Sequence, residues 1–274
     1  MSKITLLYMS TKVLGVKIDT VTEGQALDLV AKFLREGRDH YIFTPNPEMV
    51  MAAQNDYVLR EILNRGDLNI CDGKGIKLTC DLLYDKNNKD DLKYFKRISG
   101  VDFMLDICDY ANRYGFSIYL LGSGSEKTIS IAAKKLKDKF PKLNIVGYHP
   151  GPIVESIPNK KLKYRSNDNH NVITDIIQTQ PDILFVGFGH GKQEKWIAEN
   201  TKKLPGVKIV MGVGGSFDFI SGKIMRAPKI LRKMGLEWMW RLLQEPSRIK
   251  RVWTALVEFP LAFIKYRDKD KELN

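Results

Sequence analysis

The sequence predicts an α/β protein: a Rossmann-like, mainly parallel sheet with helices on both faces, followed by a C-terminal helical appendage. Two observations support this. Short apolar runs alternate with segments of helical period, and this βαβα order is typical of a parallel sheet covered by helices. Beyond about residue 220 the strand patterns stop and only helical patterns remain. The expected strands are residues 12–18, 41–43, 68–71, 116–121, 143–148, 183–186 and 207–211.

Apolar spacing and capping residues predict the helices between these strands. Thr22 and Gln25 form a capping-box pattern, which marks the start of a helix. Ser99 is expected to cap another helix. Residues 84–96 and 153–170 are polar and are expected to be loops. The remaining helices are expected at residues 22–35, 49–63, 76–83, 125–139, 171–179 and 191–203.

The change of pattern places a domain boundary near residue 220. We expect an α/β catalytic domain at residues 1–220 and a basic, amphipathic, membrane-associating appendage at 221–274. The chain has a net charge of +12, and residues 221–274 hold 13 Lys and Arg against 6 Asp and Glu. Such an excess implies anionic partners: nucleic acid, an acidic membrane face or phosphorylated substrates. One helix is expected at residues 230–244, ended by Pro246 and carrying an apolar stripe of Leu231, Met234, Trp238 and Leu242.

Composition narrows the class of protein. An apolar fraction of 43% and a mean hydropathy of −0.26 indicate a soluble globular chain. No apolar run reaches the roughly 18 residues that a membrane-spanning helix needs, and the N-terminus lacks the pattern of a signal peptide. Cys71, Cys80 and Cys108 have no metal-binding spacing, so we expect reduced thiols in the cytoplasm.

Polar residues follow two expected strands in the stretch from Tyr41 to Gly75. Thr44 and Asn46 lie just past one strand, and Asp72 lies just past the next. If the strands are parallel neighbours, these side chains converge at the carboxyl ends, where α/β proteins bind ligands. Asp72 would then be placed as a general base. The alternative is that Asp72 caps the following helix, and the two interpretations are compatible.

Three glycine-containing turns also follow expected strands. The turn at residues 121–125 resembles a dinucleotide-binding loop, but Lys127 replaces its third glycine and no acidic residue ends the next strand, which argues against NAD. A nucleoside diphosphate or a plain structural turn remains open there. The turn at residues 212–218 suits an oxygen-rich ligand, with Asp218 contacting sugar hydroxyls or capping a helix.

The third turn, residues 187–191, leads into a helix whose first turn places Gln193 toward the cleft. The competing interpretation makes Lys192 and Lys195 a solvated face and Trp196 a core residue. We accept a structural role for Trp196 and Glu194 but not for Gln193. His190 alone in a loop is weak support for a base.

The only Asp-x-Asp triplet, residues 268–270, lies in the charged C-terminal tail. Neither a metal nor any other cofactor is therefore expected. A diphosphate bound without a metal would have to be stabilised by cationic side chains and helix N-termini. Arg97 is one candidate. Arg241, Arg248 and Arg251 are three more, spaced to lie roughly on one side of a helical segment.

Several of these segments occur together in one family. TPNPEMVMAA with DGKG, RISGVDFM, GFGHGKQEKW, GVGGSFDFISGKIMRAP and GLEWMWRLLQEPSR resemble, in order, the motifs of the WecG/TagA/CpsF glycosyltransferases (glycosyltransferase family 26). The resemblance covers roughly residues 10 to 255. His190-Gly191 departs from the Ala-Pro that relatives often carry.

The resemblance implies an inverting glycosyltransferase. It would move an N-acetylmannosamine-, uronic-acid- or hexose-type sugar from a UDP-sugar to a polyprenyl-diphosphate-linked saccharide during synthesis of a cell-surface polysaccharide or teichoic-acid-type polymer. Asp72 would be the base that deprotonates the acceptor. Thr44, Asn46, Arg97 and Gln193 would position the substrates, and Arg241, Arg248 and Arg251 would bind diphosphate.

The appendage combines short apolar segments with flanking cations, which is typical of a segment lying in a bilayer interface. We therefore expect a cytoplasmic protein on the inner face of the membrane. The alternatives are packing on the catalytic domain or a homo-oligomer contact. A nucleotide-binding α/β protein without transferase activity is the second functional hypothesis. Nucleic-acid binding is the third, and it is disfavoured because no reading motif is present.

Overall fold

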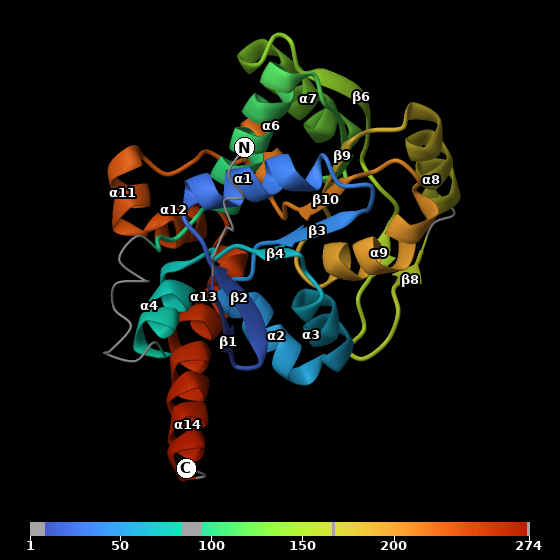
Figure 1. Ribbon diagram of the computed structural model, residues 1–274. Helices are drawn as coiled ribbons and strands as arrows, with labels where there is room; N and C mark the ends of the chain where they lie inside the picture. Colours follow the sequence, from blue (N-terminus) through green and yellow to red (C-terminus); the bar gives the residue numbers. More distant parts are fainter. Residues whose placement is uncertain (1–8, 84–94, 166–167, 273–274) are drawn as a thin grey trace, which may run out of the picture.

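The computed structural model describes residues 9–83, 95–165 and 168–272. A six-stranded sheet with the order β4-β3-β10-β9-β5-β6 forms its centre, and every strand pair in it is parallel (Figure 1). The predicted α/β class is confirmed. The strands are β3 (His40–Phe43), β4 (Leu68–Asn69), β5 (Ser117–Gly122), β6 (Asn144–His149), β9 (Ile183–Gly187) and β10 (Ile209–Gly212).

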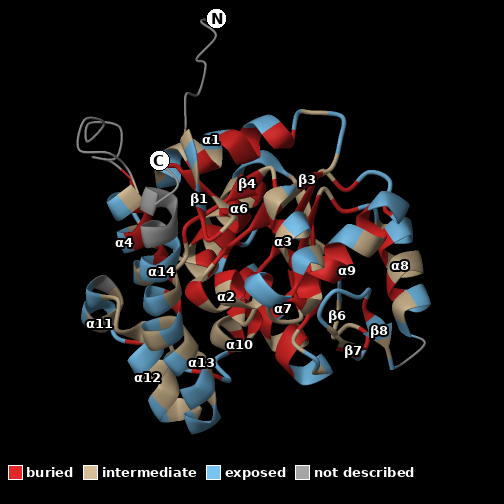
Figure 2. Ribbon diagram, turned by 90° about the horizontal axis from the view of Figure 1, so that it is seen from below, coloured by how far each residue is buried: buried red, intermediate tan, exposed pale blue. Residues whose placement is uncertain are grey.

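Helices cover both faces of the sheet because alternate strand residues point to opposite sides. In β9, Ile183 and Phe185 join one apolar core, whereas Leu184 and Val186 join the other. Buried residues accordingly concentrate on the strands in Figure 2. The first core lies under α1 (Glu23–Phe33), α6 (Gly100–Tyr114), α7 (Glu126–Lys139) and α10 (Ser216–Ser221). The second lies under α2 (Pro47–Asn55), α3 (Tyr57–Asn64), α4 (Lys74–Leu83), α8 (Asp168–Thr179) and α9 (Lys192–Asn200), which a short 3₁₀ turn, η2 (Thr201–Lys203), extends.

Capping explains several helix starts. The capping box of Thr22 and Gln25 is present at α1, with both reciprocal hydrogen bonds formed. Ser125 caps α7 by accepting from the Thr128 amide. Ser99 occupies the N-cap position of α6 as expected, but its side chain makes no capping bond.

Before residue 220, three predicted elements differ from the structure in kind or number. Residues 12–18 are not one strand but part of a hairpin of β1 (Met9–Val13) and β2 (Val16–Thr20), because Leu14 and Gly15 adopt positive φ angles of 48° and 78°. The helix expected at 49–63 is two helices, since the extended backbone of Asp56 ends α2 and its side chain caps α3. The loop expected at 153–170 contains β7 (Val154–Glu155), β8 (Lys163–Tyr164) and the start of α8. Most of the other predicted loop, 84–96, lies outside the described residues.

After α10, the described chain forms helices and turns only. The single helix expected at 230–244 is wrong: Gly235, with a φ of 70°, separates α11 (Lys229–Met234) from α12 (Glu237–Gln244). The side chain of Lys74 packs against Gly235, so a Cβ atom there would lie 2.2 Å from Lys74 Cε. As predicted, the helical run ends before Pro246: α12 stops at Gln244, and Pro246 begins a short 3₁₀ turn. The chain continues through η3 (Pro246–Arg248), α13 (Ile249–Trp253), the π-helical η4 (Thr254–Glu258) and α14 (Phe259–Glu272).

These C-terminal helices dock on the α/β part. Phe259 and Phe263 are buried, and Phe259 packs on Gly75 of α4. Arg226 donates to Asp102 of α6 (2.7 and 3.2 Å) and to Glu237 of α12 (3.1 Å), which ties the two regions together. Further along, α14 projects from the rest of the molecule (Figure 1).

Candidate active site

A cleft of about 1170 Å³ lies at the carboxyl ends of the parallel strands. Its walls come from the segments after β3, β4, β5, β9 and β10 and from the C-terminal helices. All eight residues singled out in the sequence lie on its walls: Thr44, Asn46, Asp72, Arg97, Gln193, Arg241, Arg248 and Arg251. Their roles in binding and catalysis remain predictions.

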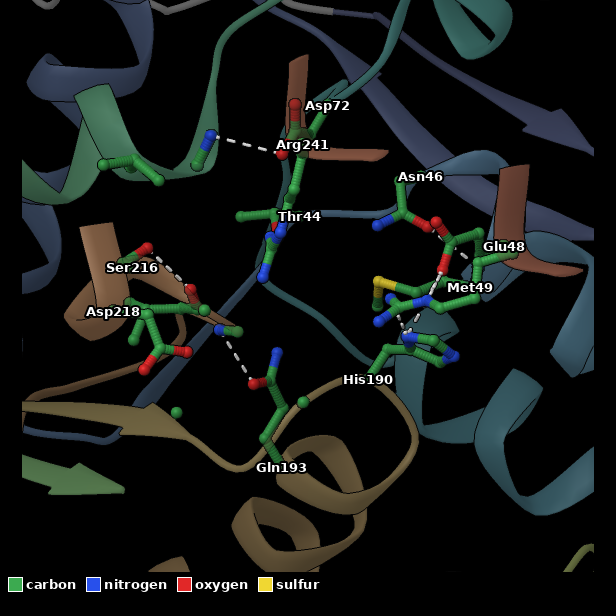
Figure 3. A pocket seen from close by; sticks show the side chains of 18 of the residues that line it. Thr44, Asn46, Glu48, Met49, Asp72, His190, Gln193, Ser216, Asp218 and Arg241 are labelled. Carbon is green, nitrogen blue, oxygen red and sulfur yellow. Dashed lines mark hydrogen bonds and ion pairs between the residues drawn. The ribbon is translucent and has the colours of Figure 1, made fainter. Parts of the chain in front are cut away.

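Thr44, Asn46 and Asp72 meet for the reason expected. β3 and β4 are parallel neighbours, with Phe43 opposite Asn69, so the segments that follow leave the sheet side by side. The Asp72 amide donates to the Pro45 carbonyl at 3.2 Å, which joins those segments directly. Figure 3 shows Thr44, Asn46 and Asp72 among the residues that line the pocket.

The Asp72 carboxylate lies at the N-terminus of α6. Its Oδ2 accepts from the Gly100 amide at 3.3 Å. The sequence left open that Asp72 caps the following helix. That helix, α4, begins at Lys74, and the Asp72 carboxylate instead bonds the start of α6, 28 residues along the chain. A Cβ atom at Gly100 would lie 3.2 Å from Thr44 Cγ2 and 3.4 Å from Asp72 Oδ2, so glycine permits this close approach.

The environment of Asp72 suits a base. Burial raises its pKa to about 6, although Arg97 and the Gly100 amide favour the ionised form. A carboxylate with this pKa is mostly ionised at neutral pH and holds a proton more readily than an exposed aspartate does.

Asn46 has a structural task in addition to the predicted one. Its Oδ1 accepts from the Met49 amide at 2.9 Å and caps α2, while the residue also lines the cleft. This bond holds the side-chain amide in a fixed orientation.

Gln193 links two of the glycine-containing turns. Its Oε1 accepts from the Gly214 amide at 2.9 Å, and its Nε2 donates to Glu194 at 2.8 Å. Glu194 is fully buried, also accepts from the Gly191 amide, and has its pKa raised to about 7 by burial. Gln193 therefore positions the turn after β10, a contact that the sequence did not indicate.

The neighbouring residues of α9 divide between the two interpretations. Trp196 is a core residue, as predicted. Lys195 is not part of a solvated face: it is 1% exposed and pairs with Asp56 at 2.6 Å. A buried lysine needs such a partner, but the partner lies on α3 and cannot be read from the local sequence.

The three C-terminal arginines converge on the cleft, as their spacing predicted. Arg241 pairs with Glu245 at 2.7 Å and stacks over Phe219, with 4.9 Å from its guanidinium carbon to the ring centre. Arg248 lies 3.8 Å from Glu245. Burial, and then the charges of Arg241 and Arg251, lower the pKa of Arg248 to about 10. The surplus of positive charge favours an anionic ligand such as a diphosphate.

Two further residues lie at the cleft: Glu48, which was missed in the sequence, and His190, which was considered there only as a base. Glu48, in the first turn of α2, forms an ion pair with Arg251 and lies 4.0 Å from Arg248. His190 lies 2.9 Å from Arg251, from its Nδ1 to the arginine Nη2. Burial, and then Arg251, lower the pKa of His190, so its ring is neutral at neutral pH and can accept this bond. Glu48 and Arg251 are 203 residues apart, so no local pattern links them.

Asp218 lines the cleft and pairs with Lys223 at 3.1 Å, while Ser123 and Gly124 place the turn after β5 on the same wall. Ser123 has a positive φ of 72°, which is rare outside glycine and asparagine.

Within the described residues, no three His, Cys, Asp or Glu side chains lie close enough together to hold a metal ion. The described helices include none that is long and apolar enough to cross a bilayer.

Comparison with known proteins extends this description. The family model "Glycosyl transferase WecG/TagA/CpsF family" matches residues 11–272. A protein of Staphylococcus aureus (strain MRSA252) is 29% identical over 243 residues, which are 88% of this chain and 87% of the relative. A protein of Staphylococcus aureus (strain MW2) is 28% identical over 242 residues, with the same coverage. Both are named N-acetylglucosaminyldiphosphoundecaprenol N-acetyl-beta-D-mannosaminyltransferase. The family match spans both the parallel sheet and the arginine-bearing helices around the cleft, and the chain therefore belongs to the WecG/TagA/CpsF family of glycosyltransferases.

Proposed function

We propose that this protein transfers a sugar from a UDP-sugar to a polyprenyl-diphosphate-linked saccharide, with inversion at the anomeric carbon and Asp72 as the base. The observation that carries the proposal is the pairing of a carboxylate and a cationic cluster in one cleft. Asp72 has a pKa raised to about 6, and Arg241, Arg248 and Arg251 line the same walls. Deprotonation of an acceptor hydroxyl needs a carboxylate, and stabilisation of a leaving diphosphate needs a cationic cluster.

In this mechanism Asp72 takes the proton of the acceptor hydroxyl as the oxygen attacks the anomeric carbon. The bond from that carbon to the diphosphate breaks in the same displacement, and UDP leaves with its electron pair. The arginines stabilise the charge that develops on the leaving diphosphate. Thr44, Asn46 and Arg97 position the substrates around Asp72, while Gln193 holds the glycine turn after β10.

The names of the relatives support the substrate class. They describe transfer of N-acetylmannosamine to an acceptor whose sugar is carried on diphosphoundecaprenol. We propose an acceptor of the same chemical type for this chain. The donor is a UDP-sugar of the N-acetylmannosamine, uronic-acid or hexose type.

A lipid-linked acceptor is confined to a bilayer, so we propose that the protein works on the inner face of the membrane. The C-terminal helices support this because many of their apolar side chains are exposed. These are Ile230, Met234, Trp238, Met239, Leu243, Ile249, Trp253, Leu256, Leu261 and Ile264. Exposed cations on the same helices, such as Lys250 and Lys265, would face anionic headgroups.

The proposal is tested by incubating the full chain with a panel of UDP-sugars and a polyprenyl-diphosphate-linked N-acetylglucosamine. We expect one donor to be consumed with release of UDP, and the product's anomeric configuration, measured by NMR, to be opposite to the donor's. A parallel reaction in excess chelator should proceed at a similar rate because no metal is required. Retention of configuration, or no turnover with any donor, would contradict the proposal.

A further inference from the structure

Glu48 stands apart from the other carboxylates of the cleft because its partners come from distant parts of the chain. It lies in the first turn of α2, two residues after Asn46, and its side chain is 17% exposed. It pairs with Arg251 of α13 and approaches Arg248 of η3. One carboxylate thus connects the strand-end segment that carries Thr44 and Asn46 to two arginines of the C-terminal helices.

The geometry at Arg251 shows what this contact does. Arg251 Nε donates a hydrogen bond to Glu48 Oε2, and His190 Nδ1 lies at hydrogen-bonding distance from Arg251 Nη2. These bonds fix the guanidinium plane and leave Nη1 uncommitted by either partner. A guanidinium fixed in this way recognises phosphate oxygens with less loss of side-chain entropy than a free one.

The charges explain why an anchor is needed. Arg241, Arg248 and Arg251 repel one another, and Arg251 is the most exposed of the three, with 39% of its side chain accessible against 18% and 17%. Without a counter-charge it would relax toward solvent. Glu245 faces Arg241 and Arg248 from their own segment, so Glu48 is the carboxylate that pairs with Arg251.

We propose that Glu48 is a positioning residue that holds Arg251, and with it the C-terminal helices, in the cleft, ready for a diphosphate. This rests on the proposed function for the identity of the diphosphate, which is that of the UDP-sugar, the lipid-linked acceptor or both. Glu48 itself touches no reacting atom. It acts through Arg251 and thereby couples docking of the C-terminal helices to substrate binding.

The first test needs no transfer activity. Binding of inorganic diphosphate to the full chain is measured by calorimetry, and amide hydrogen exchange is followed over residues 246–258. In Glu48→Gln we expect diphosphate to bind about 10-fold more weakly and exchange in this segment to rise, while α7 is unchanged. Glu48→Asp keeps the negative charge on a shorter side chain, so it should partly restore both diphosphate affinity and protection from exchange. Asp109→Asn, which removes a carboxylate from an exposed Arg113 pair on α6, is the matched control and should behave as wild type.

The second test identifies the route. If Glu48 acts through Arg251, the double variant Glu48→Gln/Arg251→Gln should be no worse than Arg251→Gln alone, because effects of residues in one network do not add. In the transfer reaction catalysed by Glu48→Gln, a higher KM for the donor would assign the arginines to the diphosphate of the UDP-sugar. A higher KM for the acceptor assigns them to the lipid diphosphate.

Two results would overturn the proposal. Unchanged diphosphate binding and hydrogen exchange in Glu48→Gln would show that Glu48 positions nothing. Tighter binding would show that it competes with the ligand for the arginines. A wild-type protein without transfer activity would contradict the proposed function alone, since the binding and exchange measurements still decide the role of Glu48.

Discussion

Asp72 combines properties that local sequence cannot specify together. It follows a strand end, as the sequence shows, but its pKa depends on burial and on the charge of Arg97. Glu237 and Asp102 act against Arg97 by raising that pKa further. The carboxylate is therefore adjusted by residues from several elements, of which only Arg97 was singled out in advance.

Asp72→Asn should lose activity and gain stability. Asn keeps the shape and can accept from the Gly100 amide, but it is not basic, so we expect the transfer rate to fall by roughly 10²–10⁴-fold. The folded-state pKa of Asp72 is raised above its usual 3.8, so this group costs stability as pH rises from about 4 to 6. The variant should therefore melt above wild type at pH 7–8 and equal to it near pH 4. Near-wild-type turnover would remove Asp72 from the mechanism.

Arg97→Met should move the pH dependence of the reaction. The base must be ionised, so kcat/KM rises with pH through about 6 in the wild-type protein. Arg97 lowers the pKa of Asp72, and its removal should shift the acid limb of the profile to higher pH. Lys96→Met, which changes an exposed neighbour, should leave the limb in place. A limb that stays fixed in Arg97→Met would show that Asp72 does not set it.

At the scale of elements, the site is bordered both by helices of the α/β part and by the C-terminal helices. The N-terminus of α6 faces Asp72, and the first turn of α2 carries Glu48. The C-terminal helices complete the walls, and Arg226 joins α6 to α12 through Asp102 and Glu237. This contact is partly buried, whereas the Arg165–Glu155 pair is exposed.

Replacing these two arginines compares the pairs directly. Arg226→Met leaves Asp102 and Glu237 without their shared partner and should cost about 1–3 kcal/mol of unfolding free energy. Arg165→Met should change the unfolding free energy far less, because exposed pairs contribute little. Denaturant-induced unfolding of both variants and the wild-type protein at the same pH measures the two changes in unfolding free energy. Equal losses would mean that Arg226 does not hold the C-terminal helices in place.

At the scale of the whole molecule, the C-terminal helices have two faces. Phe259 and Phe263 pack inward and form part of the fold, while other apolar residues remain exposed. The sequence analysis gave packing on the α/β part as the alternative to membrane association. The inward face does pack in this way. Membrane association of the outward face stays a prediction.

A triple substitution tests the outward face without disturbing the cleft. Trp253→Ser, Leu261→Ser and Ile264→Ser change residues that are 58%, 62% and 49% exposed, so the melting temperature should stay near wild type. Sedimentation with anionic liposomes should fall strongly because the apolar area is lost. The matched control changes Tyr57, Tyr114 and Ile177 to Ser, residues exposed on α3, α6 and α8. Equal sedimentation of the two triple variants would contradict the membrane role.

Much of the fold could be predicted because the deciding signals are local. Apolar runs, helical periods and the cap formed by Thr22 and Gln25 depend on residues a few positions apart. Predictions failed where one residue's backbone changed the course of the chain, as at Gly15, Asp56 and Gly235. Two of these residues contact side chains from elsewhere in the sequence: Lys74 packs against Gly235, and Lys195 pairs with Asp56.

The sequence by itself determined the fold class and the strand ends that bear Thr44, Asn46, Asp72 and Gln193, because parallel strands present their carboxyl ends at one edge. Only the tertiary structure decided the electrostatics of the site. The raised pKa of Asp72, the buried Glu194 and the pairing of Glu48 with Arg251 depend on burial and on charges from distant elements. Coulombic and desolvation energies follow distances in space, and a chain pattern carries no distances between residues 203 positions apart.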